Sequence, residues 1–212
     1  MKKRIFLALL TVTLAAGGAF AQMSVGFGVN FAASFDSYKY EAGRYYDEYE
    51  DELVYTEEMW ESMQVVFGGF FVSFDTTFLE ANIGLLFTDM GYSRFSISYL
   101  RLGLFGKYPV DFGNFSLFPT LGIQLDLCLG AKGDGKDIYS DSSEKADSMN
   151  RFWIKFGAGA DLNLTDQLYL RPMFLYGLNF GTKNDRKWIK EEKNSSAVYH
   201  GLDVCAMVGY RF

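Results

Sequence analysis

Histidine, cysteine and proline are scarce in this chain, which contains one, two and three of them, respectively, in 212 residues. A single histidine leaves one candidate for imidazole chemistry, and it gives little support to metal binding by the two cysteines. Few prolines and a share of 18% aromatic residues favour β-strands over helices or disorder. The composition therefore indicates a strand-rich protein with few of the histidine and cysteine residues that catalytic centres often use.

Long apolar runs are also missing beyond the first 21 residues. No later stretch approaches 18 consecutive apolar residues, so the sequence predicts no transmembrane helix there. Residues 1–21 combine a basic start, an apolar centre and the sequence Ala19-Phe20-Ala21, which is the pattern of a cleaved secretory signal peptide. We therefore expect signal-peptide-dependent export and one mature domain over residues 22–212.

A basic excess, which nucleic-acid binding requires, is absent as well. Without Lys2, Lys3 and Arg4, the mature chain keeps 17 of the 20 basic residues against 26 acidic ones, a formal net charge of −9. Phosphate backbones are bound by positive surfaces, so this balance excludes nucleic acid as a partner. No dinucleotide or phosphate-loop motif is complete, and no cofactor is expected.

What the sequence does contain is a repeated alternation of apolar with small or polar residues, the period of a β-strand. Eight such segments are predicted as strands, at 25–36, 63–74, 79–88, 95–109, 117–130, 152–163, 168–181 and 202–212. For the segment 63–74, MQVVFGGFFVSF, the pattern does not assign the two faces.

The connections between these segments alternate in length. Those at 75–77, 110–115 and 164–167 are short, 88–94 is intermediate, and those at about 38–62, 131–150 and 183–197 are long. Short turns at one end and long loops at the other are typical of barrels in the bacterial outer membrane. The sequence therefore predicts an all-β fold, an eight-stranded antiparallel up-and-down transmembrane β-barrel with short periplasmic turns and long external loops.

The polarity of the two strand faces predicts which one meets lipid. The apolar face is rich in Phe and Leu, and in water it would be a continuous aggregation-prone surface. The other face is rich in glycine and carries Glu80, Arg101, Lys107, Asp126, Lys155, Asp161, Arg171, Asp203 and Arg211. Four acids against five bases is close to neutral, so we expect a paired network in a side-chain-filled lumen. The alternative, a soluble ligand-carrying barrel, would require the opposite polarity.

These features resemble those of the small eight-stranded outer-membrane barrels, the group that includes OmpX, OmpW and the membrane domain of OmpA. The resemblance covers the mature chain as architecture, and its one motif is the last strand. In that group, a final strand with alternating apolar residues and a terminal Phe is read by the barrel-assembly machinery. The matching positions are Val204, Val208, Tyr210 and Phe212.

The resemblance implies a monomeric protein of the bacterial outer membrane, in contact with outer-membrane lipid and lipopolysaccharide-type lipids. It implies an envelope-structural or surface-interaction role without catalysis. Two alternatives stay open: an OmpW-like conduit for small apolar molecules, and a lipid-modifying barrel enzyme. The enzyme would need His200, which falls on the outward register near the loop end of the last strand, with Ser195 and Ser196 nearby but no recognisable motif. No catalytic or metal-binding residue is therefore assigned.

Two further features concern the cysteines and the first loop. Cys128 and Cys205 lie on the fifth and eighth predicted strands at different depths, so we expect small lumen-filling thiols and no disulfide.

The segment 39–61 holds nine acidic residues and, with Tyr38 just before it, six tyrosines. An acidic surface rich in tyrosine could bind an extracellular protein partner, although such charge runs are more often simply solvated.

Overall fold

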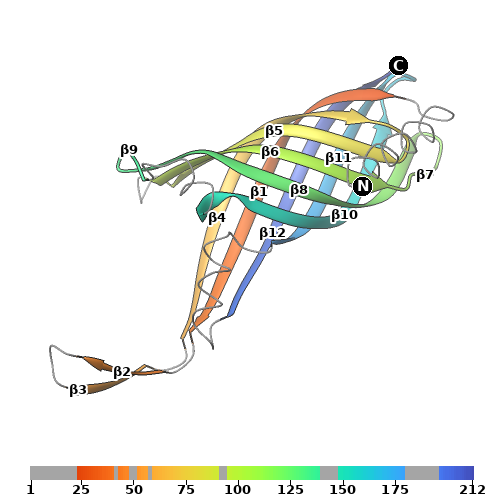
Figure 1. Ribbon diagram of the computed structural model, residues 1–212. Helices are drawn as coiled ribbons and strands as arrows, with labels where there is room; N and C mark the ends of the chain where they lie inside the picture. The colour runs from red at the N-terminus through yellow and green to blue at the C-terminus, as the bar shows by residue number, and fades with distance from the viewer. Residues whose placement is uncertain are drawn as a thin grey trace, which may run out of the picture.

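A closed barrel of eight long strands forms the body of the protein (Figure 1). The computed structural model describes residues 23–40, 43–47, 52–56, 59–90, 95–138, 148–179 and 196–212, so the predicted signal peptide lies outside the described residues. The barrel strands are β1 (Ser24–Tyr40), β4 (Met59–Asp75), β5 (Leu79–Met90), β6 (Phe95–Lys107), β8 (Phe115–Gly133), β10 (Arg151–Asn163), β11 (Leu168–Asn179) and β12 (Ser196–Arg211). The predicted fold class is confirmed.

Every barrel strand pairs antiparallel with its neighbours along the chain, and the first strand pairs with the last. The closing ladder between β1 and β12 runs from Ser24 opposite Arg211 to Lys39 opposite Ser196. At the same end of the barrel, the backbone N–H of Phe212 donates to the carbonyl of Met23 at 3.0 Å. Because the first strand pairs with the last, this part of the barrel has no unpaired strand edge. A sheet in hydrocarbon requires such closure, since lipid cannot bond to the free backbone groups of an edge.

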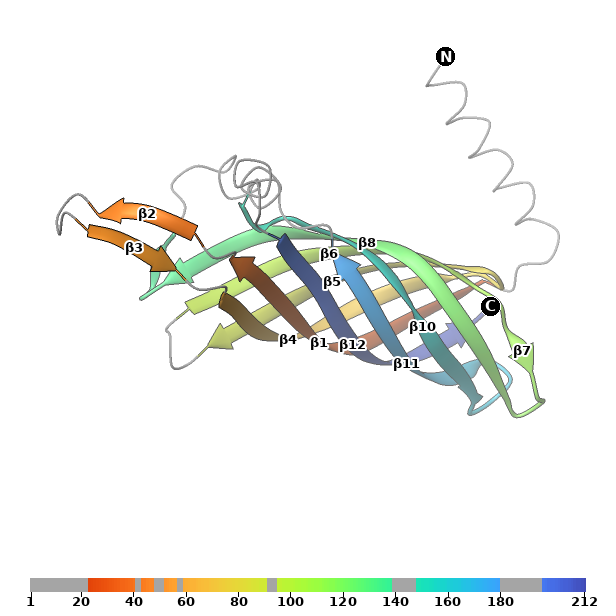
Figure 2. The same ribbon diagram turned by 90° about the horizontal axis from the view of Figure 1, so that it is seen from below.

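The two ends of the barrel differ. We call the end with the short connections 76–78, 108–114 and 164–167 the turn end, and the opposite end the loop end (Figure 2). The short strands β7 (Val110–Asp111) and β9 (Lys136–Asp137) each pair with β8. Among the described residues, no helix has the length and apolar character needed to cross a membrane.

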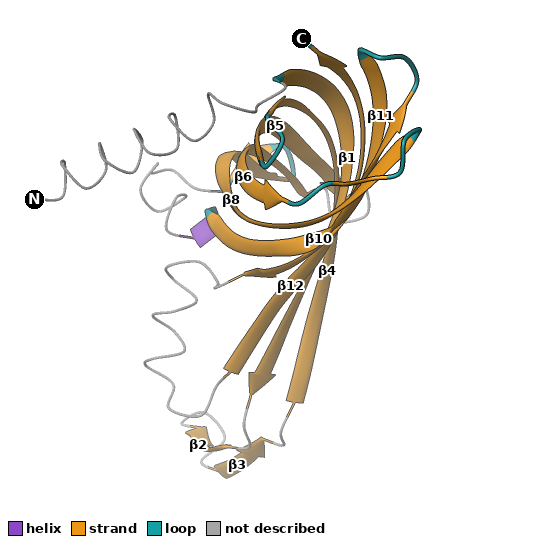
Figure 3. Cartoon of the chain, turned by 90° about the vertical axis from the view of Figure 1, so that its right-hand side faces the viewer, coloured by secondary structure: helices purple, strands orange, loops and turns teal. Residues whose placement is uncertain are grey.

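Strand pairing extends into the segment 39–61, which the sequence analysis placed in a long external loop. The ladder between β1 and β4 continues to Tyr40 opposite Met59, and β2 (Gly43–Asp47) pairs with β3 (Glu52–Thr56) as a separate hairpin. Figure 3 shows β1, β4 and β12 running together beyond the rest of the barrel at the loop end. The physical reason is that the ladder satisfies backbone groups at each further residue, and this segment is rich in strand-favouring tyrosine.

The outer surface is apolar. Phe27, Phe31 and Phe74 are each exposed by 60% or more, and Leu, Ile, Val and Phe side chains of the other strands continue this belt. Aromatic rings gather at the turn end, where Phe112 and Phe115 stack with ring centroids 5.1 Å apart. An apolar band bordered by aromatic side chains is the outer surface that a membrane barrel presents to lipid.

The structure assigns the faces of β4 that the sequence left open. Val65, Phe67, Phe71 and Ser73 are buried in the lumen, whereas Val66, Phe70 and Phe74 are exposed on the outside. Both faces are apolar, so periodicity alone could not separate them. Their assignment follows from the register, in which Asp75 lies opposite Ser24 of β1 and Glu80 of β5.

A bulge interrupts the alternation near the loop end of β8. Ser98 of β6 pairs with Gly130 and Tyr99 pairs with Cys128, so Leu129 is the extra residue. Leu129 is exposed on the outside, and Ala131 rather than Gly130 is buried. A bulge of this kind shifts the inward register by one residue.

Candidate functional site

The barrel interior contains the polar side chains that the sequence analysis placed on the lumen face. Eight of those nine predicted residues are buried, and Arg211 is partly exposed at the turn end. They divide into two separate networks of ion pairs. We call these the turn-end network and the mid-barrel network.

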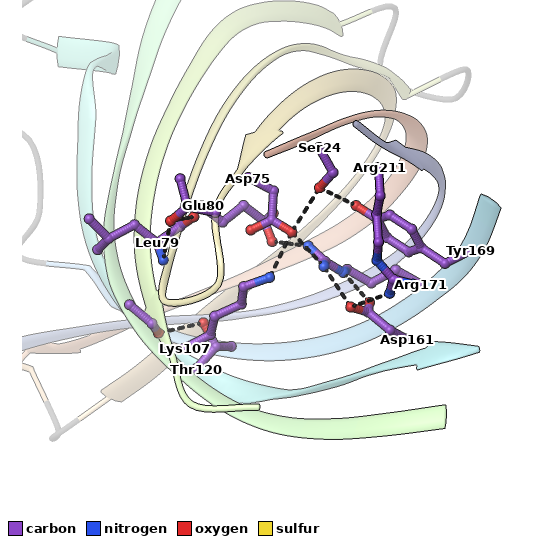
Figure 4. Close-up of polar contacts among 12 residues, drawn as sticks. Ser24, Asp75, Leu79, Glu80, Lys107, Thr120, Asp161, Tyr169, Arg171 and Arg211 are labelled. Atoms are coloured by element: carbon purple, nitrogen blue, oxygen red, sulfur yellow. Dashed lines mark hydrogen bonds and ion pairs between the residues drawn. The ribbon is translucent and has the colours of Figure 1, made fainter. Parts of the chain in front are cut away.

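Arg171 is the centre of the turn-end network (Figure 4). From β11 its guanidinium donates to Asp161 of the neighbouring strand twice, at 2.5 and 2.9 Å. The same group reaches across the lumen to Glu80 Oε2 at 2.7 Å and to Asp75 Oδ2 at 2.6 Å. Because Asp75 and Glu80 lie directly opposite on β4 and β5, Arg171 separates two carboxylates that would otherwise repel each other.

Lys107 and Arg211 complete this network. Lys107 Nζ donates to Asp75 Oδ2 at 2.6 Å, and Arg211 Nη2 lies 3.5 Å from Asp161 Oδ2. The network therefore holds three carboxylates and three cations: Asp75, Glu80 and Asp161 with Lys107, Arg171 and Arg211. Its formal charge is zero, which is the condition under which buried charges are tolerated.

Aromatic rings hold Arg171 in place. Its guanidinium carbon lies 5.0 Å from the ring centroid of Phe118 and 4.9 Å from that of Tyr169. Tyr169 also stacks under Arg211, at 4.4 Å, and its hydroxyl lies 3.0 Å from that of Ser24. A guanidinium this close to two aromatic rings gains cation–π attraction from both, so this cation is held by more than its carboxylates.

The mid-barrel network has Arg101 at its centre. Arg101 donates to both oxygens of the opposite Asp126, at 2.8 and 3.0 Å, and across the lumen to Asp203 at 2.9 Å. Lys155 also pairs with Asp203, and the indole N–H of Trp153 donates to Asp126 at 2.9 Å. Two carboxylates and two cations again give a formal charge of zero. This network joins β6, β8, β10 and β12 through the lumen.

Asp75 is the network residue that the sequence analysis missed. It was assigned to the turn 75–77, whereas the structure places it as the last residue of β4 and 5% exposed. With Asp75 included, the two networks hold five carboxylates and five cations, so the imbalance expected from sequence disappears. The available signal was its spacing, because Asp75 continues the inward alternation of Phe71 and Ser73.

Little space is left in the lumen between the two networks and on the loop-end side of the mid-barrel network. One cavity of about 10 Å³ lies between them, lined among others by Glu80, Arg101 and Asp203. A second, of about 20 Å³, lies on the loop-end side of the mid-barrel network, beside Trp153 and Arg151. Cavities of this size hold about one water each. The lumen therefore contains packed side chains where an ion channel would contain water.

The loop-end half of the lumen contains an apolar cluster together with buried polar residues such as Ser34 and Thr88. A buried cluster there comprises Ala32, Val65, Phe67, Leu86, Ile97, Tyr99, Cys128 and Ala131, with Met149 packed against it. Cys205 belongs to a different cluster near the turn end, together with Phe71, Phe118 and Met207. Both cysteines are buried, and neither forms a disulfide within the described residues.

The proposed assembly-signal residues lie on the outer face of the last strand. Val204, Val208 and Tyr210 point to the outside, and Phe212 is 78% exposed. The ring centroids of Tyr210 and Phe212 are 5.3 Å apart at the turn end. This geometry leaves the whole stripe accessible from outside the barrel wall.

His200 lies on the outer wall within a group of aromatic side chains. Its Nδ1 is 3.1 Å from the hydroxyl of Tyr176, and its ring centroid is 5.4 Å from that of Phe35. Ser195 lies outside the described residues, and the side chain of Ser196 is not described. Among the residues that the structure describes, no group of three or more potential metal ligands occurs.

The acidic segment 39–61 contributes backbone pairing to the structure, but its side chains are outside what the structure describes. Its predicted partner interaction therefore stays a prediction. The same holds for the lipid, assembly-machinery and monomer predictions.

Comparison with known proteins gave structural neighbours only. No family model and no curated protein matches the sequence. Neisserial surface protein A is 12% identical with a TM-score of 0.49, covering 88% of this chain and 97% of that one. Outer membrane protein OprG from Pseudomonas aeruginosa is 12% identical with a TM-score of 0.39, covering 91% and 97%. Ail of Yersinia pestis, solved with a heparin analogue, is 9% identical with a TM-score of 0.37, covering 90% and 99%.

The fold is established by the strand pairing of this chain itself. Its eight strands close antiparallel, its outer wall is apolar and its interior is charged and paired. The chain is a closed eight-stranded antiparallel barrel with the architecture of the small bacterial outer-membrane barrels.

Proposed function

We propose that this protein is an integral protein of the bacterial outer membrane with a plugged lumen, and that it acts through its loop end as an envelope-structural or surface-interaction protein. The observation that carries the proposal is the inverted polarity of the barrel. Arg171 is 1% exposed inside, whereas Phe31 is 62% exposed outside. An apolar wall of this extent is stable when it is covered by lipid, and it would aggregate in water.

A plugged lumen supports a function at the ends of the barrel and not inside it. The ladders of β1 with β4 and β12 continue to Tyr40 and Lys39, and the hairpin of β2 and β3 follows in the chain. This segment is strongly acidic, so its extracellular partner would be a protein with a basic surface. Signal-peptide export, insertion by the barrel-assembly machinery through the last strand, contact with lipopolysaccharide-type lipids and a monomeric state belong to the same proposal.

Refolding in detergent tests the membrane assignment. A folded membrane barrel resists detergent, so the unboiled sample should migrate differently on a denaturing gel from the boiled sample. In cells, the protein should fractionate with the outer membrane, and protease added to intact cells should cleave within 41–58. A fully water-soluble monomer with no heat-dependent mobility would contradict the proposal.

One observation favours a second candidate, a conduit for small apolar molecules. The ladder between β4 and β5 ends at Gly68 opposite Phe87, although both strands continue toward the loop end. Figure 1 shows β4 diverging from β5 there. We call the unpaired boundary beyond this last pair the seam. Phe67, the first residue of β4 past the ladder, and Leu86, one residue inside it on β5, belong to the apolar loop-end cluster. An apolar molecule could leave the loop-end lumen sideways into lipid through such a seam.

A reversible disulfide between β4 and β5 separates the two candidate functions. Phe67→Cys and Thr88→Cys, in a variant with Cys128 and Cys205 replaced by alanine, would form this disulfide and close the seam when oxidised. The conduit predicts that oxidation slows uptake of a small apolar fluorophore into cells, and that reduction restores it. If uptake changes neither when the protein is absent nor when the disulfide forms, the conduit is contradicted and the structural or surface-interaction role is retained.

A further inference from the structure

A polar vestibule opens at the turn end of the barrel, below the turn-end network. Its volume is about 330 Å³, within the range of small-molecule sites. The residues that line it include Asp75, Lys107, Asp111, Ser116, Asp161 and Arg211. This space is much larger than the two cavities inside the lumen, and the plugged-barrel role makes no use of it.

The vestibule contains hydrogen-bonding capacity that the protein leaves unused. An ammonium group has three donors, and Lys107 Nζ uses one of them, on Asp75 Oδ2. Asp111 adds an exposed carboxylate to the same wall, and one of its oxygens accepts the backbone N–H of Gly113 at 2.7 Å. Lys107 is only 9% exposed, so bulk water provides little compensation for its remaining donors.

The charges of the vestibule select the class of ligand. Asp75 and Asp161 are already paired with Arg171, and a cation there would be repelled by that buried guanidinium. An anion at Lys107 would meet the carboxylates of Asp75, Asp111 and Asp161 in the same space. A neutral ligand group that both accepts and donates hydrogen bonds avoids the repulsion that a cation would meet from Arg171 and an anion from the carboxylates.

The geometry points to a binding site for a neutral polyhydroxylated ligand, such as a saccharide, in the turn-end vestibule. One ligand hydroxyl accepts a hydrogen bond from Lys107 Nζ, and an adjacent hydroxyl donates to the exposed carboxylate of Asp111. Ser116 adds a hydroxyl to the wall, and Arg211 and Asn163, bonded to each other at 2.7 Å, form a further part of it. The site depends on the barrel fold alone and does not depend on the proposed role of the loop end.

Titration of the refolded full mature chain with glucose and with N-acetylglucosamine tests the site. The barrel is kept in a detergent without a sugar head group, because a maltoside would compete for the vestibule. Binding is followed by amide chemical shifts in NMR spectra. We expect saturable shifts confined to residues 75–77, 107–116 and 161–163.

Two variants and one matched control make the test specific. Ser116→Leu fills the vestibule without removing any member of the ion networks, and Lys107→Met removes the donor. Each should raise the apparent Kd by about tenfold or more, a factor that corresponds to about 1.4 kcal/mol. Ser98→Leu makes the same substitution near the loop end of β6, and it should leave the Kd unchanged.

The possible outcomes decide the proposal. Saturable binding that Ser116→Leu weakens and Ser98→Leu does not would support it, even if Lys107→Met fails to refold. Binding of inorganic phosphate in place of both sugars would overturn the ligand class. Absence of saturable shifts at the vestibule with either sugar would overturn the site, whatever the function of the barrel proves to be.

Discussion

Arg171 and Asp161 form a two-point ion pair between neighbouring strands, with Nε donating to Oδ1 at 2.5 Å and Nη2 to Oδ2 at 2.9 Å. The two side chains are 1% and 9% exposed. The guanidinium of this pair continues across the lumen to Asp75 and Glu80. One bidentate contact thus fixes the cation that holds β4, β5, β10 and β11 together inside the barrel.

Removal of this cation should therefore destabilise the barrel. Arg171→Ala leaves three buried carboxylates with only Lys107 and Arg211 nearby, a change that typically costs about 3–5 kcal/mol. Urea unfolding of the refolded protein in lipid vesicles, followed by tryptophan fluorescence, should show a clearly lower midpoint. Asp161→Ala should act in the same direction. The exposed turn residue Asp166 is the matched control, because its replacement by alanine should change stability by no more than about 0.5 kcal/mol.

The wild-type lumen should not conduct ions. Two neutral ion-pair networks and cavities of about 10 and 20 Å³ leave no continuous water path. Planar-bilayer recordings of the refolded protein should show no steady open channel. A large and stable conductance, together with lumen variants that do not alter stability, would mean that water fills the barrel.

Deletion of Phe212 should reduce the amount of protein in the outer membrane. The residue is exposed at the end of the outward stripe, where the resemblance assigns it to recognition by the assembly machinery. The signal peptide would still be cleaved, so unassembled protein should accumulate in the periplasm. Cell fractionation with immunoblotting measures both pools. Deletion of Met23, which bonds to Phe212 through its backbone, controls for loss of a terminal residue, and equal surface levels in all three proteins would exclude the role.

Both cysteines should be free thiols. Cys128 and Cys205 are buried in different clusters of the lumen and are not bonded to each other. A maleimide should label both residues in urea-unfolded protein without reductant, and label neither rapidly in the folded barrel. Mass spectrometry counts the adducts. Labelling that appears only after reduction would show that the strand registers around these residues differ from those described.

His200→Ala separates the non-catalytic role from the lipid-modifying alternative. The His200 imidazole contacts Tyr176 and Phe35 on the outer wall, as a side chain of an aromatic girdle does. We expect the same lipid A mass spectrum from cells with the wild-type protein, with the variant and without the gene. A lipid A mass shift that requires both the protein and His200 would establish an enzyme.

The fold could be predicted from sequence because a barrel wall has a strict local rule. Each strand alternates lipid-facing and lumen-facing residues, so Val204 and Val208 on one side and Asp203 and Cys205 on the other can be read off the printed chain. Where both faces are apolar, as in 63–74, the alternation does not show which face points to the lumen. It also fails just after Leu129, where the bulge moves burial from Gly130 to Ala131.

The sequence by itself determined that the chain alternates in eight segments, that one face of most segments is apolar, and that the opposite face carries nearly balanced charges. The tertiary structure alone decided which charges meet. Arg171 is 91 positions from Glu80 and 96 from Asp75 along the chain, and the three converge because the closed barrel brings their strands around a common axis. Local periodicity specifies the direction of a side chain, whereas its partner across the lumen depends on strand number, register and closure, which are properties of the whole barrel.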